Sequence, residues 1–243
     1  MQILLKFVTD NPNFPLDYRS TFLSFFKKSL SIFENGKWVE SFYMGNRRKP
    51  FTFAVNLPSA KFLKEYIILG KNEIKLTIST PDSFLGYLFL CAFEWQIDQP
   101  FAVACKNKII LRKVLVLRNN CVNNNKMIIK MESPLCLREH DKATNKDFYY
   151  SVASEKFNEQ CKRVLKAQML ADGISEHLAE SVKVTPINCK KTVVLHYGTY
   201  IECSLGVFKI EADNTILSYF LQTGLGSRKS EGFGFAKLIS NFD

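Results

Sequence analysis

The chain has 243 residues, of which 47% are hydrophobic and 23% charged, and this composition excludes disordered, collagen-like and coiled-coil proteins. Its 33 basic side chains exceed the 23 acidic ones, and most of the net charge of +10 lies in residues 1–123, which contain 17 basic and 9 acidic residues. Because a basic surface attracts polyanions, nucleic acid is the first partner to consider, with an anionic membrane surface as the alternative.

The first half of the chain alternates strands and helices. Residues 2–8 alternate apolar and polar side chains as a strand does, and after the break at Pro15 apolar residues at helical spacing predict a helix over 16–31. A second helix is predicted to run to about Trp95, with Asp82 or Ser83 as its cap. Short strands are predicted over 38–43, 51–57, 62–69, 73–79, 102–104 and 109–117.

A run of asparagines divides the chain. Asn119, Asn120 and residues 123–125 form a polar, turn-prone segment. We place the domain boundary here, which predicts an N-terminal domain of residues 1–121 and a C-terminal domain of residues 126–243.

The second half repeats the plan of the first. A long helix is predicted over 151–170, ended by Asp172 and Gly173. The other predicted elements are strands over 126–131, 192–197, 202–210 and 234–239 and a short helix or turn over 212–222. Each half thus has the order of a split β-α-β unit. We expect an α+β protein of two tandem ferredoxin-like (RRM-like) domains, the second with a glycine-rich loop over 224–234.

Membrane spans, disulfides and metal sites are not expected. No apolar run approaches the ~18–20 residues of a transmembrane helix, and the first residues do not resemble a signal peptide. The seven cysteines are odd in number and at least 14 residues apart, which favours reduced thiols in a cytoplasmic protein. His140, His177 and His196 form no metal-ligand pattern. We therefore expect a soluble, cytoplasmic protein without metal or cofactor.

The segment over 224–234, GLGSRKSEGFG, carries the most information. Glycines let backbone N–H groups approach a phosphate closely, Arg228 and Lys229 add positive charge, and Ser227 and Ser230 add hydroxyl donors. The segment is neither a Walker A loop nor a Rossmann fingerprint. A phosphate-binding loop and the tip of a long β-hairpin with turn glycines both remain open.

Four segments together resemble a known family. The G-x-G run followed by G-F-G in 224–234 is similar to its C-terminal signature, and SPLCLR at 133–138 resembles its S-P-hydrophobic-x-hydrophobic-R segment. KPFTF at 49–53 is similar to its K-P-F-T-F-S strand, with Ala54 in place of the usual Ser, and LDYR at 16–19 leads into a helix as in the family. The family comprises the CRISPR-associated endoribonucleases of the RAMP superfamily, which cut precursor CRISPR RNA within its repeats. The resemblance spans nearly the whole chain and implies two tandem ferredoxin-like domains.

The resemblance implies RNA cleavage without metal. In the family, the 2′-hydroxyl upstream of the scissile phosphate attacks in line and leaves a cyclic phosphate and a 5′-hydroxyl. Such chemistry needs a base, an acid and positive charge near the phosphorane. Many members use a histidine after the first helix, a tyrosine on that helix and a lysine near the K-P-F strand. Here IFENG at 32–36 places Phe33 at the histidine position, the tyrosine falls on Phe25 or its neighbour, and only the lysine is retained, as Lys49.

Three interpretations of the activity remain open. In the first, Lys49, Lys28 and Tyr43 orient the 2′-hydroxyl and stabilise the transition state, so that the protein still cleaves. In the second, it binds the repeat and cuts slowly or not at all. In the third, it is a structural RAMP subunit of a CRISPR effector complex. For Lys28 and Lys49 the alternative to a catalytic role is a solvated surface cation, and for Tyr43 it is a half-buried strand aromatic.

The resemblance also implies binding of CRISPR repeat RNA, both precursor and mature crRNA, on a basic face of a monomer or homodimer. Subunits of a CRISPR effector complex are further candidate partners, and no membrane is expected. The candidate RNA contacts are Arg47, Arg48, Arg112, Lys113, Arg138, Gly224, Gly226, Ser227, Arg228, Lys229, Ser230, Gly232, Phe233 and Gly234.

Overall fold

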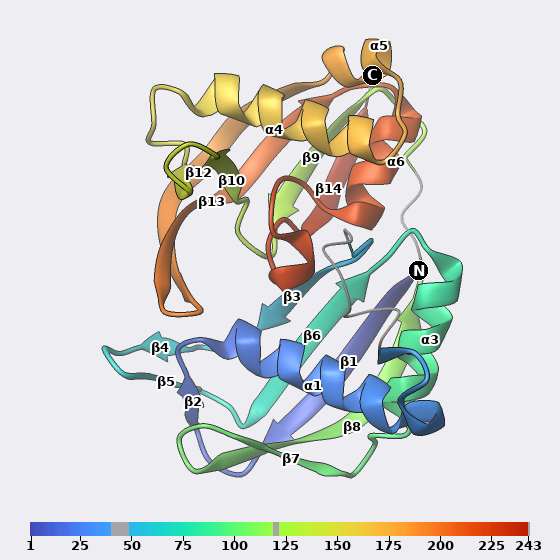
Figure 1. Cartoon of the computed structure of the whole chain (residues 1–243), viewed down its shortest axis with the longest axis vertical. Coiled ribbons are helices and arrows are strands. Elements are labelled where there is room, and N and C mark those ends of the chain that lie inside the picture. Colours follow the sequence, from blue (N-terminus) through green and yellow to red (C-terminus); the bar gives the residue numbers. More distant parts are fainter. Residues whose placement is uncertain (40–48, 119–121, 243) are drawn as a thin grey trace. The chain divides into compact units, whose positions relative to one another are not determined.

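The computed structural model describes residues 1–39, 49–118 and 122–242 (Figure 1). Contacts between residues divide the chain into two units. The first consists of Met1–Phe51, Val55–Arg118 and Leu195–Tyr197, and the second of Thr52–Ala54, Asn119–Val194 and Gly198–Asp243. Both are mixed α/β units with antiparallel sheets, as expected for tandem ferredoxin-like domains.

The first unit is built on a five-stranded sheet with the strand order β3-β6-β1-β8-β7 (Figure 1), although Thr52–Ala54 of β3 are counted with the second unit. Its helices are α1 and α3, and the short turn η1 follows α1 directly. The bounds are β1 Gln2–Thr9, α1 Tyr18–Ile32, η1 Phe33–Gly36, β3 Thr52–Asn56, β6 Glu73–Ser79, α3 Ser83–Glu94, β7 Pro100–Val103 and β8 Asn107–Leu117. A small sheet is formed by β2 (Asn13–Pro15), β5 (Tyr66–Ile68) and β4 (Lys61–Phe62).

The alternating burial of the side chains of β1 shows which face of this sheet the helices cover. Ile3, Leu5 and Phe7 are buried, and the Phe7 ring lies 5.4 Å from that of Phe22 on α1. Phe25, one turn further along α1, is stacked on Phe93 of α3 at 5.9 Å. The helices therefore pack on one face of the sheet, and the even-numbered positions of β1 lie on the other face.

The second unit has a four-stranded sheet with the order β12-β13-β9-β14 and a separate hairpin, β10-β11 (Figure 1). Phe157 of α4 stacks on Phe208 of β13 at 6.3 Å, and Phe220 of α6 is buried in the same core. The bounds are β9 Lys126–Met131, β10 Leu137–Asp141, β11 Lys146–Tyr150, α4 Phe157–Ala171, α5 Glu176–Glu180, β12 Lys183–His196, β13 Thr199–Glu211, α6 Asn214–Thr223, η2 Lys229–Glu231 and β14 Ala236–Phe242.

Several predicted elements differ from the structure. The strand predicted over 62–69 is replaced by the short strands β4 and β5, and α4 begins at Phe157 because Ser151 and Ser154 form turns before it. Of the strand predicted over 38–43, residues 40–43 lie outside the described residues, and the two before them are not in a strand. In the described part of the chain, no helix has both the length and the apolar character needed to cross a membrane.

Candidate nucleic-acid interface

Three lysines stand side by side on the face of the first sheet that the helices do not cover. Lys6 of β1 is directly opposite Lys75 of β6 on one side and Lys113 of β8 on the other. Its chain neighbours Leu5 and Phe7 are buried in the core, so Lys6 points to the opposite face. We call these three side chains the lysine row.

The charges of the lysine row are not neutralised by the protein. Within residues 1–39, 49–118 and 122–242, none of the three lysines forms an ion pair. Like charges directly opposite each other on neighbouring strands destabilise a sheet. If the three lysines were only solvated cations, no contact would offset this repulsion. The arrangement is therefore typical of a surface that receives an anionic ligand.

A β-bulge explains why both Arg112 and Lys113 are exposed. The pairing of β8 with β1 shifts its register just after Lys6, which leaves Arg112 as the extra residue. Arg112 Nη1 donates a hydrogen bond to Asp98 Oδ1 at 2.6 Å. Of these two predicted contacts, Lys113 thus belongs to the lysine row, whereas Arg112 is held by a carboxylate.

Lys6 and Lys75 were not among the residues predicted from the sequence. Each occupies an outward position in an alternating strand, which is a detectable signal for exposure. That they lie in one row with Lys113, however, depends on the register of three strands that are far apart in the chain.

The glycine-rich loop, residues 224–234, is packed against the second unit rather than projecting from it. Leu225 N donates to Gly234 O at 2.9 Å, which closes the base of the loop. Gly234 N donates to Pro134 O and Ser227 N donates to Cys136 O, both at 2.8 Å. The loop thus continues the hydrogen bonding of the segment that precedes β10.

A buried glutamine of α4 holds the inner side of the loop. Gln168 is 3% exposed. Its Nε2 donates to Gly224 O at 2.9 Å, and its Oε1 accepts a hydrogen bond from Gly226 N at 2.8 Å. One side-chain amide therefore satisfies two buried backbone groups, which would be costly to leave without partners.

The close approach of backbones explains why glycine is needed in the loop. Gly226 and Gly234 have φ of +86° and +74°, values that side chains other than glycine rarely adopt. A Cβ at Gly226 would lie 2.6 Å from Cys136 O, and one at Gly234 would lie 2.0 Å from Leu225 O. Packing accounts for these two glycines whether or not a phosphate binds.

Arg228 is embedded in a network that joins the loop to the β10-β11 hairpin. Its Nη1 donates to Glu231 Oε2 at 2.7 Å, and its Nη2 donates to Tyr149 Oη at 2.9 Å. Arg228 Nη2 and Arg138 Nη2 lie 3.5 and 2.7 Å from the two carboxylate oxygens of Asp147. Two predicted RNA contacts, Arg138 and Arg228, thus meet on one carboxylate.

Lys229 and Ser227 are also engaged within the second unit. Lys229 Nζ lies 3.9 Å from Asp172 Oδ2 and 5.9 Å from the centre of the Tyr219 ring. Ser227 Oγ accepts a hydrogen bond from Arg138 N at 3.3 Å. The remaining predicted residues of the loop are Ser230, partly exposed in η2, and the buried Gly232 and Phe233.

Burial and hydrogen bonds shift the pKa of Asp147 in opposite directions. Burial by itself raises the pKa of this carboxyl, but hydrogen bonds from Arg138, His140 and Tyr149 outweigh burial and lower the pKa from 3.8 to about 2. A lowered folded-state pKa contributes stability that is present above the unfolded value and is lost as the pH falls through the folded value.

Asp147→Asn is therefore expected to remove an acid-sensitive contribution to stability. Between pH 4 and pH 2 the parent protein should lose about 1–2 kcal/mol of unfolding free energy that the variant does not lose, a value reduced for solvent screening. Urea unfolding at a series of pH values measures this difference, and Glu155→Gln, at an exposed carboxylate of the same unit, is the control. Parallel pH profiles for the parent and Asp147→Asn would contradict the role of this network.

The candidate catalytic residues fall in the first unit. Lys28 is exposed on α1. Lys49 is half-buried just before β3, and its carbonyl accepts a hydrogen bond from Phe51 N at 2.9 Å. The rings of Phe51 and Phe26 lie 6.3 Å apart, so the segment that contains Lys49 passes the middle of α1. Tyr43, Arg47 and Arg48 lie outside the described residues.

The two aromatic residues predicted from the motifs to stand at the family's acid–base positions are packed as hydrophobic groups. Phe25 is 1% exposed and contacts Phe101 edge to face at 5.4 Å. Phe33 is the first residue of η1, and its ring meets that of Trp95 edge to face at 6.1 Å. Neither ring can transfer a proton.

The three histidines lie on the β10-β11 hairpin, on α5 and at the end of β12. His140 Nδ1 lies 2.8 Å from Asp147 Oδ1 on the hairpin, and His177 is exposed on α5. His196 is buried, with Nδ1 3.3 Å from Asp17 Oδ1 at the N-terminal cap of α1. Phe33 follows the other end of this helix, which is roughly 20 Å long.

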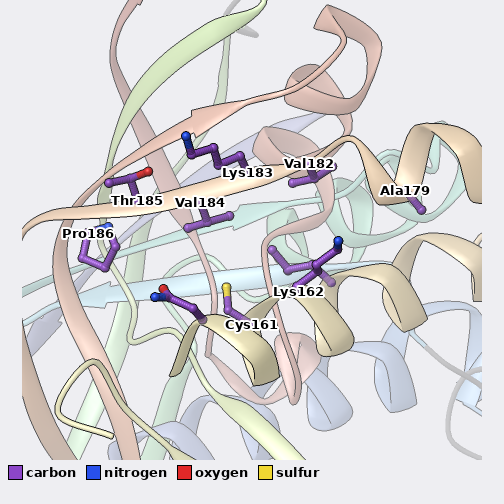
Figure 2. Close-up of a pocket in the computed structure, with 10 residues that line it drawn as sticks. Cys161, Lys162, Ala179, Val182, Lys183, Val184, Thr185 and Pro186 are labelled. Atoms are coloured by element: carbon purple, nitrogen blue, oxygen red, sulfur yellow. The ribbon is translucent and has the colours of Figure 1, made fainter. Parts of the chain in front are cut away.

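The second unit also has a pocket between α4, α5 and the first half of β12 (Figure 2). Its volume is about 360 Å³. Cys161, Leu165 and Val184 give it apolar walls, and Lys162 and Lys183 also line it. None of the predicted site residues that the structure describes borders this pocket.

Comparisons with known proteins agree with the motifs. Residues 117–238 match the family model described as "CRISPR associated protein Cas6, C-terminal". Among solved structures, "An RAMP protein binding different RNA substrates" is 19% identical with a TM-score of 0.82, covering 99% of this chain and 100% of that one. "Characterization of a Cas6-related gene from Pyrococcus furiosus" is 20% identical with a TM-score of 0.82, covering 100% and 99%.

A third structure, "CRISPR associated protein Cas6", is 20% identical with a TM-score of 0.74 and covers 99% of both chains. These likenesses extend over both units and confirm the predicted fold. A search of curated proteins finds no match to the chain. The family match covers half of the chain and confirms the resemblance seen in the sequence motifs. The chain belongs to the Cas6 family of CRISPR-associated proteins.

Proposed function

We propose that this protein binds CRISPR repeat RNA and cleaves precursor CRISPR RNA within the repeat. The observation that carries the binding proposal is the lysine row, Lys75–Lys6–Lys113, whose three ammonium groups have no carboxylate partner in the described part of the chain. Family membership supports repeat RNA as the polyanion, and one solved relative is described as binding different RNA substrates.

The geometry of the lysine row suits a nucleic-acid backbone. Neighbouring strands lie about 4.8 Å apart, and each lysine has a flexible stem of four carbons. The three ammonium groups can therefore adjust to successive phosphates of one strand. Phosphate contacts of this kind fix the position of the RNA without reading its sequence.

The glycine-rich loop is proposed as a second contact with the RNA. Arg138 and Arg228 are fixed by Asp147, so their guanidinium groups are ordered before any ligand arrives. Ser230 and Lys229 lie in η2, at the tip of the loop. A preordered loop loses little conformational entropy on binding, which raises affinity.

Cleavage is proposed to proceed without metal, by attack of the 2′-hydroxyl on the adjacent phosphate to give a cyclic phosphate and a 5′-hydroxyl. The catalytic residues proposed are Lys49, Lys28 and Tyr43. Positive charge near the phosphorane and orientation of the 2′-hydroxyl can supply much of the acceleration without an ideal base. The exposure of Lys28 on α1 is compatible with this role.

Lys28→Ala and Lys49→Ala are each expected to lower the single-turnover cleavage rate about 100-fold, since each removes positive charge near the reacting phosphate. The affinity for the repeat should change far less, and a quantified gel assay at saturating protein separates the two effects. Lys27→Ala is the matched control, because it removes the same charge from the next exposed position of α1. Equal rates for Lys27→Ala, Lys28→Ala and Lys49→Ala would exclude these lysines from catalysis.

A second candidate function is repeat binding without cleavage. It is favoured by the aromatic residues predicted at both acid–base positions, since Phe25 is buried in the core and Phe33 packs on Trp95. Such a protein would retain the lysine row and bind tightly while leaving the RNA intact. It could then act as a structural subunit of a CRISPR effector complex.

A further inference from the structure

Two cysteines lie opposite each other beneath the glycine-rich loop. Leu135 and Ser204 form an antiparallel bridge with both hydrogen bonds, at 2.8 and 3.0 Å. In an antiparallel pair, the next residue on one strand faces the preceding residue on the other. Cys136 therefore faces Cys203, at a non-hydrogen-bonded position of the two strands.

The backbone of Cys136 agrees with this placement. Its carbonyl turns away from β13 and accepts the hydrogen bond of Ser227 N in the loop at 2.8 Å. The side chains of Cys136 and Cys203 are both 0% exposed and belong to one buried cluster with Phe233 of the loop. The loop thus covers both sulfur atoms.

This geometry fits a disulfide. Residues at such a non-hydrogen-bonded position have Cα atoms about 4.5 Å apart. Disulfides span Cα separations of about 4.4–6.8 Å, so the bond can form with little movement of the backbone.

Both thiols are free in the structure. A hydrogen bond with the Cys203 thiol, together with burial, holds the pKa of the Cys136 thiol well above its usual value. Since the thiolate is the reactive form, oxidation is slow while the loop is closed. Because both cysteine side chains are 0% exposed, an oxidant can reach them only when the loop opens.

We propose that Cys136 and Cys203 form a site of reversible oxidation. A peroxide closes a disulfide there, and the disulfide ties the segment before β10, to which the glycine-rich loop is hydrogen-bonded, to β13. One sulfur attacks a peroxide oxygen, the O–O bond breaks, and a sulfenic acid and one water form. The second sulfur then displaces the hydroxyl group, which leaves as a second water with the remaining thiol proton. In total, two thiols and one hydrogen peroxide give one disulfide and two waters.

The disulfide should stabilise the second unit independently of RNA. It cross-links two positions that are far apart in the chain, which removes conformational freedom from the unfolded state. We expect the melting temperature to rise by roughly 5–10 °C on oxidation and to return after treatment with a reductant. Amide exchange at Ser227, which bonds to Cys136 O, should slow at the same time.

The test is peptide mapping of the whole protein after treatment with hydrogen peroxide, under non-reducing conditions. Cleavage after lysine and arginine places Cys136 in residues 131–138 and Cys203 in residues 192–209, with no other cysteine in either peptide. The expected result is a cross-linked pair of these two peptides that disappears on reduction.

Two variants distinguish disulfide formation between Cys136 and Cys203 from general oxidation of cysteines. Cys203→Ala should abolish both the linked peptide and the rise in melting temperature. Cys161→Ala, at a buried cysteine of the same unit whose pKa is raised to about 12 by burial alone, should leave both unchanged. If the exposed Cys105 becomes oxidised while residues 131–138 and 192–209 stay unlinked, the proposal is wrong.

Discussion

Replacing Lys6, Lys75 and Lys113 together by alanine is expected to weaken binding of repeat RNA about 100-fold at low salt, if each ammonium–phosphate contact contributes about 1 kcal/mol. The lysines are adjacent on three neighbouring strands, and no described carboxylate neutralises them. Each contact with single-stranded RNA also releases counterions. The slope of log affinity against log salt should therefore become shallower by about 2.

Fluorescence anisotropy with labelled repeat RNA at several salt concentrations measures both quantities. The control is the triple variant Lys61→Ala, Lys64→Ala and Lys71→Ala, which removes three exposed lysines of the same unit that lie outside the row. A control variant that loses as much affinity as the test variant would show that only net charge matters. An unchanged salt slope in the test variant would exclude the lysine row as a phosphate site.

Gly234→Ala is expected to destabilise the second unit by about 3 kcal/mol, the sum of backbone strain at positive φ and loss of loop hydrogen bonds. The new Cβ would lie 2.0 Å from Leu225 O, and that residue is hydrogen-bonded to Gly234. The base of the loop must therefore open, which also breaks the bond from Gly234 N to Pro134 O. Chemical denaturation measures the loss.

Gly173→Ala provides a matched control for backbone strain. Gly173 also has a positive φ, +83°, but nothing lies within 4 Å of a Cβ placed there. This variant should cost only about 1 kcal/mol, which is the strain term alone. Equal losses for the two variants would mean that close packing of the loop contributes nothing.

Hydrophobic periodicity predicted most of the secondary structure, because burial of one face leaves a strong local pattern. The strand at 2–8 and the helices at 16–31 and 82–95 are confirmed as β1, α1 and α3. The first half of β12 was missed because Pro186 argues against a strand. β12 lies at the edge of its sheet, where proline is tolerated. The β10-β11 hairpin was missed because its strands are rich in charged residues.

The candidate site was less predictable, since it depends on contacts between distant segments. Lys113 was predicted from charge, but its neighbours Lys6 and Lys75 emerge only from the pairing of β6, β1 and β8. From the sequence, the glycines of the loop left a phosphate-binding loop and a hairpin tip with turn glycines both open. In the structure, Gly226 and Gly234 make room for the backbones of Cys136 and Leu225. Neither neighbour could be identified from local sequence.

The most direct test of the proposed function is a cleavage assay on the cognate repeat RNA in EDTA, with a parallel substrate that carries a single 2′-deoxy nucleotide at the scissile position. The account predicts one defined cut that persists in EDTA and vanishes with the 2′-deoxy substrate, because the attacking hydroxyl is then missing. Tight binding with no cut in either substrate would contradict cleavage and would identify a repeat-binding protein in which Phe33 marks the loss of the reaction.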